Sequence, residues 1–478
     1  MSFRKNLFKN VIILGGYSYS TQILGFLSTI ILSRLLLPSD YGFIALITVF
    51  TGFIKEFSDA GLSYIIIRSD YNRLFQTTIH YLALVIGVFL AAIVVLLAYP
   101  ISVFYKDPAL ILPTIVMSSG FILRSFNTVP YGVLSKELKF NKLGMIELVT
   151  SAVDVTLMIT FAALNFSYWS LIIPGIFSNI LRIIMYRSFT QIRLRNLKRK
   201  YLVVGFRKAK SLIGNLTGFN LLNYWGRNSG NLIIGKVFGT QSLGIYDRSY
   251  KVLSLALGVM TGLFGKVLYP SLKSLSNKGG DDKKEYLNIL GVISLLNFPV
   301  STLLIFFSEP LVRILWSQRW IQVAELLPYI GILILTQTLN STTGNIFILK
   351  GKEKILMLLG IPGNIAIILA IGAGAFFSMT HVLRFYSLVS VAFDVPLVMY
   401  YGFWKCFGYE VPVILKFWGP KVLLSILLIA SVWLGYTWLT GIFMSLYFIH
   451  LIINQKEDII NTYKFVLKRV MKNRSRNV

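Results

Sequence analysis

The sequence predicts an all-α polytopic membrane protein with about fourteen transmembrane helices, arranged as two pseudo-symmetric six-helix lobes plus two C-terminal helices. The 478 residues are 55% hydrophobic and only 14% charged, whereas soluble domains carry about 25% charged residues. Apolar runs of about 20 residues, which is the length that crosses a bilayer core, recur along almost the whole chain. Basic residues gather in short clusters between these runs. A soluble multidomain enzyme is therefore excluded.

Each predicted span is an apolar run between two groups of charged or turn-forming residues. Gly and Pro inside the runs are compatible with this interpretation, because membrane helices contain them more often than soluble helices do. The first six spans are expected at residues 11–32, 41–66, 78–99, 109–130, 143–164 and 169–188. The next six are expected at 211–235, 242–268, 286–308, 322–348, 355–377 and 380–404, and a final hairpin at 418–436 and 438–454.

The lysine and arginine residues give the topology. Of the 47, 33 fall in the N-terminal tail, in every second connection and in the C-terminal tail, 5 fall in the opposite connections, and 9 fall inside predicted spans. By the positive-inside rule the basic side is cytoplasmic. We therefore expect a multi-pass protein of the cytoplasmic (inner) membrane with both termini in the cytoplasm. The outer connections are short, so no folded active site is expected outside the membrane.

The longest basic connection, residues 189–210, divides the chain into two halves. We expect an N-lobe at 1–188 with spans one to six, and a C-lobe at 211–404 with spans seven to twelve. The hairpin then occupies 405–455, and a basic cytoplasmic tail follows at 456–478.

The two halves contain an internal repeat. With a constant offset of 202, the segment from Arg34 to Gly42 aligns with the segment from Lys236 to Gly244, and each lies in the first outer connection of its half. The same offset relates polar stripes at helical spacing in spans one and seven. These stripes consist of Ser18, Gln22, Gly25 and Thr29, and of Asn220, Tyr224, Arg227 and Asn231. Interhelical hydrogen bonding would explain the stripes, as would a central cavity lined by both repeats, which is transporter architecture.

Nine basic residues inside the spans need compensation, because a charge at mid-bilayer costs about 2.5–3.5 kcal/mol on insertion scales. Some are explained by position or by a neighbour. Arg182, Lys266, Lys421 and Arg384 are expected to snorkel to a surface. Two pairs at a spacing of four, Asp247 with Lys251 and Lys55 with Asp59, are candidates for ion pairs.

Arg124 and Arg227 lie deeper and have no acidic residue three or four positions away. We expect both to face a wet, cationic cavity. Such a cavity suits an anionic cargo, since a guanidinium group can donate two hydrogen bonds at once to a phosphate. The candidate substrate-binding residues are Arg124, Arg227, Lys55, Arg248, Asn223, Asn231 and Gln22.

Carboxylates inside the spans are candidates to carry a coupling proton or cation such as H⁺ or Na⁺. Glu147 and Asp154 are seven residues apart and therefore share one face of span five. Asp59 and Asp394 complete this set. The same side chains could instead neutralise basic residues on neighbouring helices.

Other chemistry is not indicated. Cys406 is the only cysteine, and the three histidines are too scattered for a metal site. The net charge of +28 lies in topogenic loops, so nucleic-acid binding is not expected. No Gly-rich phosphate loop occurs, which argues against built-in ATP hydrolysis. We expect no cofactor and no enzymatic activity.

Several segments resemble a known family. They are Ser33-Arg-Leu-Leu-Leu-Pro-Ser-Asp-Tyr-Gly42, Phe57-Ser-Asp-Ala-Gly61, Lys136-Glu-Leu-Lys-Phe140, Tyr168-Trp-Ser-Leu171, and the stretch from Arg227 to Asp247. Together they are similar to the Wzx-type polysaccharide and O-antigen flippases, in particular the subgroup that includes the colanic acid exporter. One departure is Gly230, which stands where that subgroup usually has an aspartate.

This resemblance implies the multidrug, oligosaccharidyl-lipid and polysaccharide exporter superfamily. It further implies alternating access without a cofactor, membrane lipids as surroundings, polysaccharide polymerases as partners, and an undecaprenyl-pyrophosphate-linked oligosaccharide as cargo. Two other functions remain open from the residues alone. A multidrug-type exporter of apolar cations fits poorly with deep arginine residues. A membrane glycosyltransferase or polymerase fits poorly with short outer loops.

Overall fold

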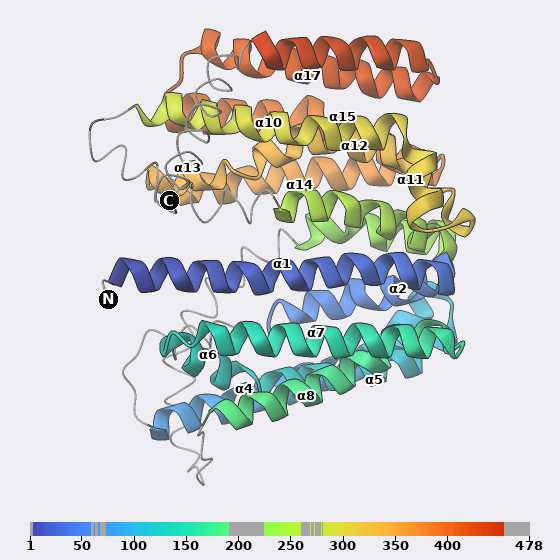
Figure 1. Cartoon of the computed structure of the whole chain (residues 1–478). Helices are drawn as coiled ribbons and strands as arrows, with labels where there is room; N and C mark the ends of the chain where they lie inside the picture. The colour runs from blue at the N-terminus through green and yellow to red at the C-terminus, as the bar shows by residue number, and fades with distance from the viewer. Residues whose placement is uncertain are drawn as a thin grey trace, which may run out of the picture. The chain divides into compact units, whose positions relative to one another are not determined.

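The computed structural model describes residues 3–58, 62, 66, 73–190, 224–259, 268, 272, 279 and 281–453. All regular secondary structure in these residues is helical (Figure 1). The chain forms two compact units. Unit 1 comprises Met1–Ile245 with Leu315–Trp320, and unit 2 comprises Tyr246–Ile314 with Ile321–Val478.

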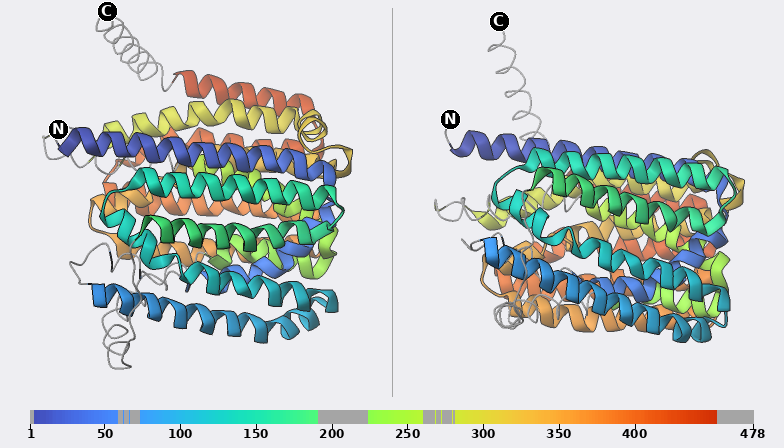
Figure 2. Two further views of the ribbon diagram at one scale, coloured as in Figure 1. Left: turned by 60° about the horizontal axis from the view of Figure 1, so that its bottom comes forward. Right: turned by 90° about the horizontal axis from the view of Figure 1, so that it is seen from below.

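Unit 1 contains seven labelled α-helices, most of them long. Helix α1 packs along α7, α4 along α5, and α7 along α8, and both views in Figure 2 show these pairs side by side. Short 3₁₀ turns, η1 (Pro108–Leu110) and η2 (Ser167–Leu171), precede α5 and α8. The helices are α1 (Phe3–Leu35), α2 (Pro38–Lys55), α4 (Arg73–Tyr105), α5 (Ile111–Ser125), α6 (Thr128–Lys136), α7 (Phe140–Ala163) and α8 (Ile173–Phe189).

Helix α2 begins at a well-defined N-terminus. Pro38 occupies the first turn, where its missing N–H is not needed. The Asp40 carboxylate accepts a hydrogen bond from the backbone N–H of Leu37 at 2.8 Å, and a second one from the Ser167 hydroxyl. These bonds fix the direction in which α2 starts, and so they position the residues that α2 presents one to five turns later.

The predicted span 109–130 is interrupted in the structure. Helix α5 ends at Ser125, and α6 starts at Thr128 and continues to Lys136. Pro130 gives the reason, because it has no N–H for the carbonyl of Phe126 and its ring crowds that same carbonyl. The polar side chain of Asn127 lies at the break, where it is buried.

The internal repeat is visible inside unit 1 at two glycines. A Cβ atom on Gly42 would lie 1.7 Å from the carbonyl oxygen of Thr240, and one on Gly244 would lie 1.8 Å from that of Pro38. The offset of 202 that carries Gly42 onto Gly244 also carries Pro38 onto Thr240. The contact is therefore reciprocal, which is the pattern of a two-fold axis. Just before it, Gly239 has a φ of 79°, which turns the chain between predicted spans seven and eight.

A short segment from the second half of the chain also belongs to unit 1. In Leu315–Trp320 the indole of Trp320 is fully buried and donates a hydrogen bond to the carbonyl of Ser33 at 2.7 Å. Its ring also meets the edge of Tyr41. The segment thus packs on the end of α1 and the start of α2.

Unit 2 repeats the pattern of a broken fourth span. Helix α12 ends at Asn340 and α13 begins at Gly344, so the predicted span 322–348 is also interrupted. The hydroxyl groups of Ser341, Thr342 and Thr343 bond to carbonyls three residues earlier. These local bonds compete with the helix and explain its end. The first helices of the unit are α10 (Asp282–Phe306), α11 (Ser308–Leu315), α12 (Val323–Asn340), α13 (Gly344–Leu349) and α14 (Glu353–Ala375).

The twelfth predicted span is one helical stretch with two π-helical parts. It runs through α15 (Met379–Val389), η4 (Ser390–Asp394), α16 (Val395–Val398) and η5 (Met399–Phe407). Such π-helical turns are rare and often mark functional positions.

The C-terminal hairpin is confirmed. Helix α17 (Val411–Leu434) ends at Gly435, whose φ of 75° reverses the chain. An apolar helix, Thr437–Ile453, then returns.

The all-α, polytopic fold class is confirmed. Eight helices in the described part are long and apolar enough to cross a membrane, and Leu359–Ala375 and Thr437–Ile453 are shorter apolar helices. Every predicted span overlaps a helix in the described residues.

Candidate substrate cavity in unit 1

Unit 1 contains a cavity of about 340 Å³ between α2, α5 and α8. Each helix contributes one face to it. Helix α2 gives residues 48, 51, 52 and 55, and α5 gives 117, 120, 121 and 124. Both sets follow the spacing i, i+3, i+4, i+7, which places side chains on a single face of a helix. Helix α8 and the turn before it give residues 171, 172, 175, 176 and 179.

The charged residues in this lining are two cations. Lys55 is the last residue of α2, and Arg124 lies in the last turn of α5. The C-terminal end of a helix favours positive charge, because its carbonyl groups carry the negative end of the helix dipole. Both side chains are exposed, and they are close enough to repel one another. The cavity therefore presents two positive charges that a bound anion would neutralise.

Neutral polar groups complete the lining. The hydroxyls of Thr48 and Thr51 donate to carbonyls of α2 itself, at Ala45 and Ile47. Asn179 donates from Nδ2 to the carbonyl of Gly175 at 2.6 Å. Its Oδ1 atom is buried and has no hydrogen-bond partner among the described residues.

Three glycines keep the cavity open. Gly120 and Gly175 have nothing within 4 Å of the place where a Cβ atom would lie. At Gly52 a Cβ would meet the hydroxyl of Tyr224 at 2.5 Å, and that hydroxyl donates to the carbonyl of Val49 at 2.6 Å. The open space at the first two positions is thus available to a ligand.

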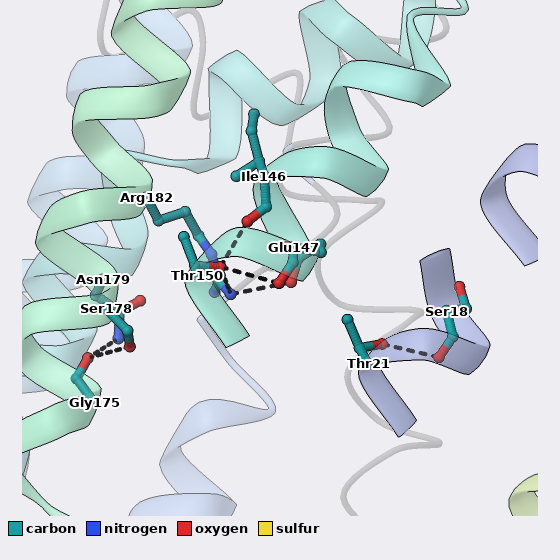
Figure 3. A network of polar contacts seen from close by, with 9 residues as sticks. All are labelled: Ser18, Thr21, Ile146, Glu147, Thr150, Gly175, Ser178, Asn179 and Arg182. Atoms are coloured by element: carbon teal, nitrogen blue, oxygen red, sulfur yellow. Dashed lines mark hydrogen bonds and ion pairs between the residues drawn. The ribbon is translucent and has the colours of Figure 1, made fainter. Parts of the chain in front are cut away.

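A polar network extends from the cavity along α8 to α7 (Figure 3). Arg182 lies one turn beyond Asn179 and bonds through Nη2 to Oε2 of Glu147 and to the hydroxyl of Thr150, each at 3.0 Å. The alternative that Glu147 neutralises a basic residue on a neighbouring helix is confirmed by this ion pair. Arg182 is also close enough to repel Arg124.

Asp154 lies two turns along α7 from Glu147. It is attracted by Arg182 and lies beside the hydroxyl of Ser178, and its Oδ1 atom is buried without a partner among the described residues. The two carboxylates thus share one arginine, and Glu147 holds it in this structure.

The structure brings Lys55 and Arg124 together but places the other predicted ligands elsewhere. Gln22 on α1 is exposed, and a Cβ on Gly25, on the same stripe, would meet nothing within 4 Å. Arg227 is exposed and Asn231 half-buried on the helical residues 224–245 of unit 1, and neither lines the cavity described above. Arg248 belongs to unit 2, where it is buried. Asn223 and Asp59 lie outside the described residues.

Further intramembrane charges lie in unit 2. Asp394 accepts a hydrogen bond from Asn340 at 3.4 Å and faces Gly363, where a Cβ would lie 2.8 Å from its Oδ1 atom. The predicted pair of Asp247 and Lys251 is confirmed at 2.6 Å.

Two snorkelling predictions are tested in unit 2. For Lys421 the prediction is wrong, since its side chain is 0% exposed, donates to the carbonyl of Phe417 and lies over that residue's ring. Arg384 donates to the Tyr329 hydroxyl at 3.0 Å and stacks on Trp433.

The family model described as "Polysaccharide biosynthesis protein" matches residues 31–325, more than half of the chain. The chain belongs to this family. Among curated proteins it is 23% identical over 349 residues to the lipopolysaccharide biosynthesis protein WzxC of Escherichia coli, covering 70% of this chain and 68% of the relative. It is 23% identical over 348 residues to a membrane protein of the Klebsiella pneumoniae cps region, covering 71% and 70%. It is 19% identical over 314 residues to the teichuronic acid biosynthesis protein TuaB of Bacillus subtilis, covering 64% and 63%.

Two solved structures share the fold of this polysaccharide biosynthesis family member. The lipid II flippase MurJ in an inward closed conformation has a TM-score of 0.66 at 13% identity, covering 92% of this chain and 100% of that one. An inward-facing multidrug resistance transporter of the MATE family and MOP superfamily has a TM-score of 0.62 at 14% identity, covering 79% and 94%. The family match includes the cavity residues Lys55, Arg124 and Asn179, whereas Asp394 lies beyond it.

The cavity signal was present in the sequence. Sequence reasoning selected Lys55 and Arg124 as isolated charges but missed the two stripes that end in them and the stripe of α8 that ends in Asn179. The spacing i, i+3, i+4, i+7 of Thr48, Thr51, Gly52 and Lys55 is the pattern in the sequence that indicates one small, polar face of α2.

Proposed function

We propose that this protein is a flippase that moves an undecaprenyl-pyrophosphate-linked oligosaccharide repeat unit from the cytoplasmic to the outer leaflet by alternating access, for surface polysaccharide biosynthesis. The observation that carries the proposal is the pair Lys55 and Arg124 in a cavity whose described lining contains no carboxylate. Two cations in one lining suit a diphosphate, and the planar guanidinium of Arg124 can bind it through two parallel hydrogen bonds.

The relatives support this substrate class. Their names refer to the biosynthesis of lipopolysaccharide, teichuronic acid and amylovoran, and one is a succinoglycan biosynthesis transport protein, ExoT of Rhizobium meliloti. The names refer to four different polymers. A cavity that binds the diphosphate rather than a particular glycan is consistent with that variety.

The proposal includes the topology expected from the basic residues. The protein lies in the cytoplasmic membrane with both termini inside, and six spans, six spans and a hairpin make up its lobes. The cargo, membrane lipids and a polysaccharide polymerase are its partners. The other predicted ligands are proposed to contact the cargo before or after it occupies this cavity. They are Arg227, Arg248, Asn231, Asn223 and Gln22.

Coupling of transport to H⁺ or Na⁺ is assigned to carboxylates whose oxygens can still accept a hydrogen bond or bind a cation. Asp154 has an oxygen without a partner among the described residues, and Asp394 has only a long hydrogen bond to Asn340. Glu147 is held by Arg182 and becomes available only if that arginine moves. Asp59 remains a further candidate.

The test is replacement of the chromosomal gene by Lys55→Gln and Arg124→Gln. We expect surface polysaccharide to fall at least tenfold, and lipid-linked repeat units to accumulate in membrane extracts. Arg313→Gln is the matched control, because Arg313 is exposed on the short helix α11. Wild-type export by both variants at normal protein abundance would refute the function.

A further inference from the structure

Among the described residues that line the cavity, Asn179 is the one with a buried side-chain oxygen that has no hydrogen-bond partner. It is 8% exposed, lies on α8, and faces the same space as Lys55 and Arg124. Its Nδ2 donates to Gly175, whereas Oδ1 has no partner among the described residues. A buried amide oxygen without a hydrogen bond is uncommon in native proteins and calls for an explanation.

The orientation of this amide is determined by its surroundings. Exchanging Oδ1 and Nδ2 would place one carbonyl oxygen against another, that of Gly175, at 2.6 Å. The oxygen is therefore the atom left without a partner, and the missing group is a hydrogen-bond donor.

The neighbouring charges restrict what that donor is. Lys55 and Arg124 line the same cavity and are hydrogen-bond donors, but in this structure neither donates to the Asn179 oxygen. A metal cation would meet two like charges there. The ligand must supply negative charge for Lys55 and Arg124 and a hydrogen-bond donor for Asn179. An anion that also carries a neutral N–H or O–H group does both, because its charged part binds the cations while its donor reaches the amide oxygen.

We propose that Oδ1 of Asn179 accepts a hydrogen bond from a hydroxyl or amide N–H of the sugar linked directly to the diphosphate. Asn179 is then a specificity-determining residue that distinguishes glycosylated from bare lipid diphosphate. This inference rests on the proposed function. The open space at Gly120 and Gly175 gives the first sugar room beside the amide.

The experiment uses the full-length protein in lipid nanodiscs and three probes: undecaprenyl diphosphate, and the same lipid carrying one glucose or one N-acetylglucosamine. The wild type is expected to bind at least one glycosylated probe about tenfold more tightly than the bare diphosphate. Asn179→Leu is expected to lose this preference while its affinity for the bare diphosphate stays within twofold. If Asn179→Leu is not recovered from membranes, Asn179→Ala carries the same expectation.

Ser118→Ala is the matched control. Ser118 is similarly buried on α5, and its hydroxyl donates to the carbonyl of Ile115 at 2.6 Å, but it does not line the cavity. We expect the control to bind all three probes like the wild type.

The failures can be told apart. Two results would overturn the role of Asn179. In the first, Asn179→Leu still prefers the glycosylated probes, which would mean that the amide contacts only water. In the second, Asn179→Leu loses the same affinity for all three probes. A wild type that binds no probe, together with an Arg124→Gln variant that exports normally, would instead remove the proposed function and this inference with it.

Discussion

Gly42 lies against the backbone at Thr240, and Gly244 lies against the backbone at Pro38, so closely that neither glycine has room for a side chain. The two would-be Cβ atoms meet carbonyl oxygens of Thr240 and Pro38 at 1.7 and 1.8 Å. Two glycines that are 202 residues apart therefore serve as equivalent halves of one contact.

Gly42→Ala and Gly244→Ala are each expected to destabilise the protein by about 1–3 kcal/mol, because backbone atoms must move to admit a methyl group. The measurement is the thermal unfolding midpoint of the purified protein. Gly25→Ala on α1 is the control, since its Cβ would meet nothing within 4 Å. A Gly42→Ala protein as stable as the control would show that the close approach is not maintained.

Leucine at Gly120 or Gly175 is expected to fill the cavity without disturbing the fold. Both positions have free space around a Cβ atom, so protein abundance should remain near that of the wild type. Export should fall at least tenfold, measured as surface polysaccharide per cell. Gly372→Leu on α14 has equal free space outside the cavity, and its export should be normal. Normal export by both cavity variants would mean that the cargo does not occupy this space.

Lys55→Gln is expected to raise the unfolding midpoint while it lowers export. Lys55 and Arg124 repel one another across the cavity, so removing one charge relieves that repulsion. Functional sites commonly lower stability in this way. Lys55→Arg keeps the charge and should preserve both properties. A lower midpoint in Lys55→Gln would indicate that the lysine is a structural residue rather than a ligand.

Glu147→Gln is expected to lower the unfolding midpoint more than the double change of Glu147→Gln with Arg182→Gln does. The single change leaves Arg182 without its carboxylate inside the membrane, and the double change removes the unbalanced charge as well. Since both side chains are partly exposed, the coupling in a double-mutant cycle should be about 1 kcal/mol. Additive effects of the two changes on the unfolding midpoint would contradict the ion pair.

The fold was largely predictable because membrane helices are defined by length and apolar composition. Every predicted span overlaps a helix in the described part of the chain, and the final hairpin turns at Gly435 as expected. The interruptions at residues 126–127 and 341–343 were not predicted, because they depend on single residues such as Pro130 and not on average hydropathy. Helix ends moved for the same reason, with α17 beginning at Val411 rather than at residue 418.

The site was predictable only in part. Depth within a span predicts that Arg124 needs a polar environment, and the structure places it in the cavity lining, but depth cannot tell which helices meet. For that reason Lys421 was assigned to the surface, whereas a backbone carbonyl with an aromatic ring holds it. Asn179 carries no charge and was not among the predicted ligands.

The break between α5 and α6 has a consequence for how the cargo travels. Pro130 leaves the carbonyl of Phe126 without its helical donor, two residues beyond Arg124. Within the hydrocarbon layer such a group is tolerated only inside protein or beside a water-filled space. The helix break beside the cationic pair therefore does not face lipid, and a diphosphate headgroup that reaches the pair passes a polar backbone group.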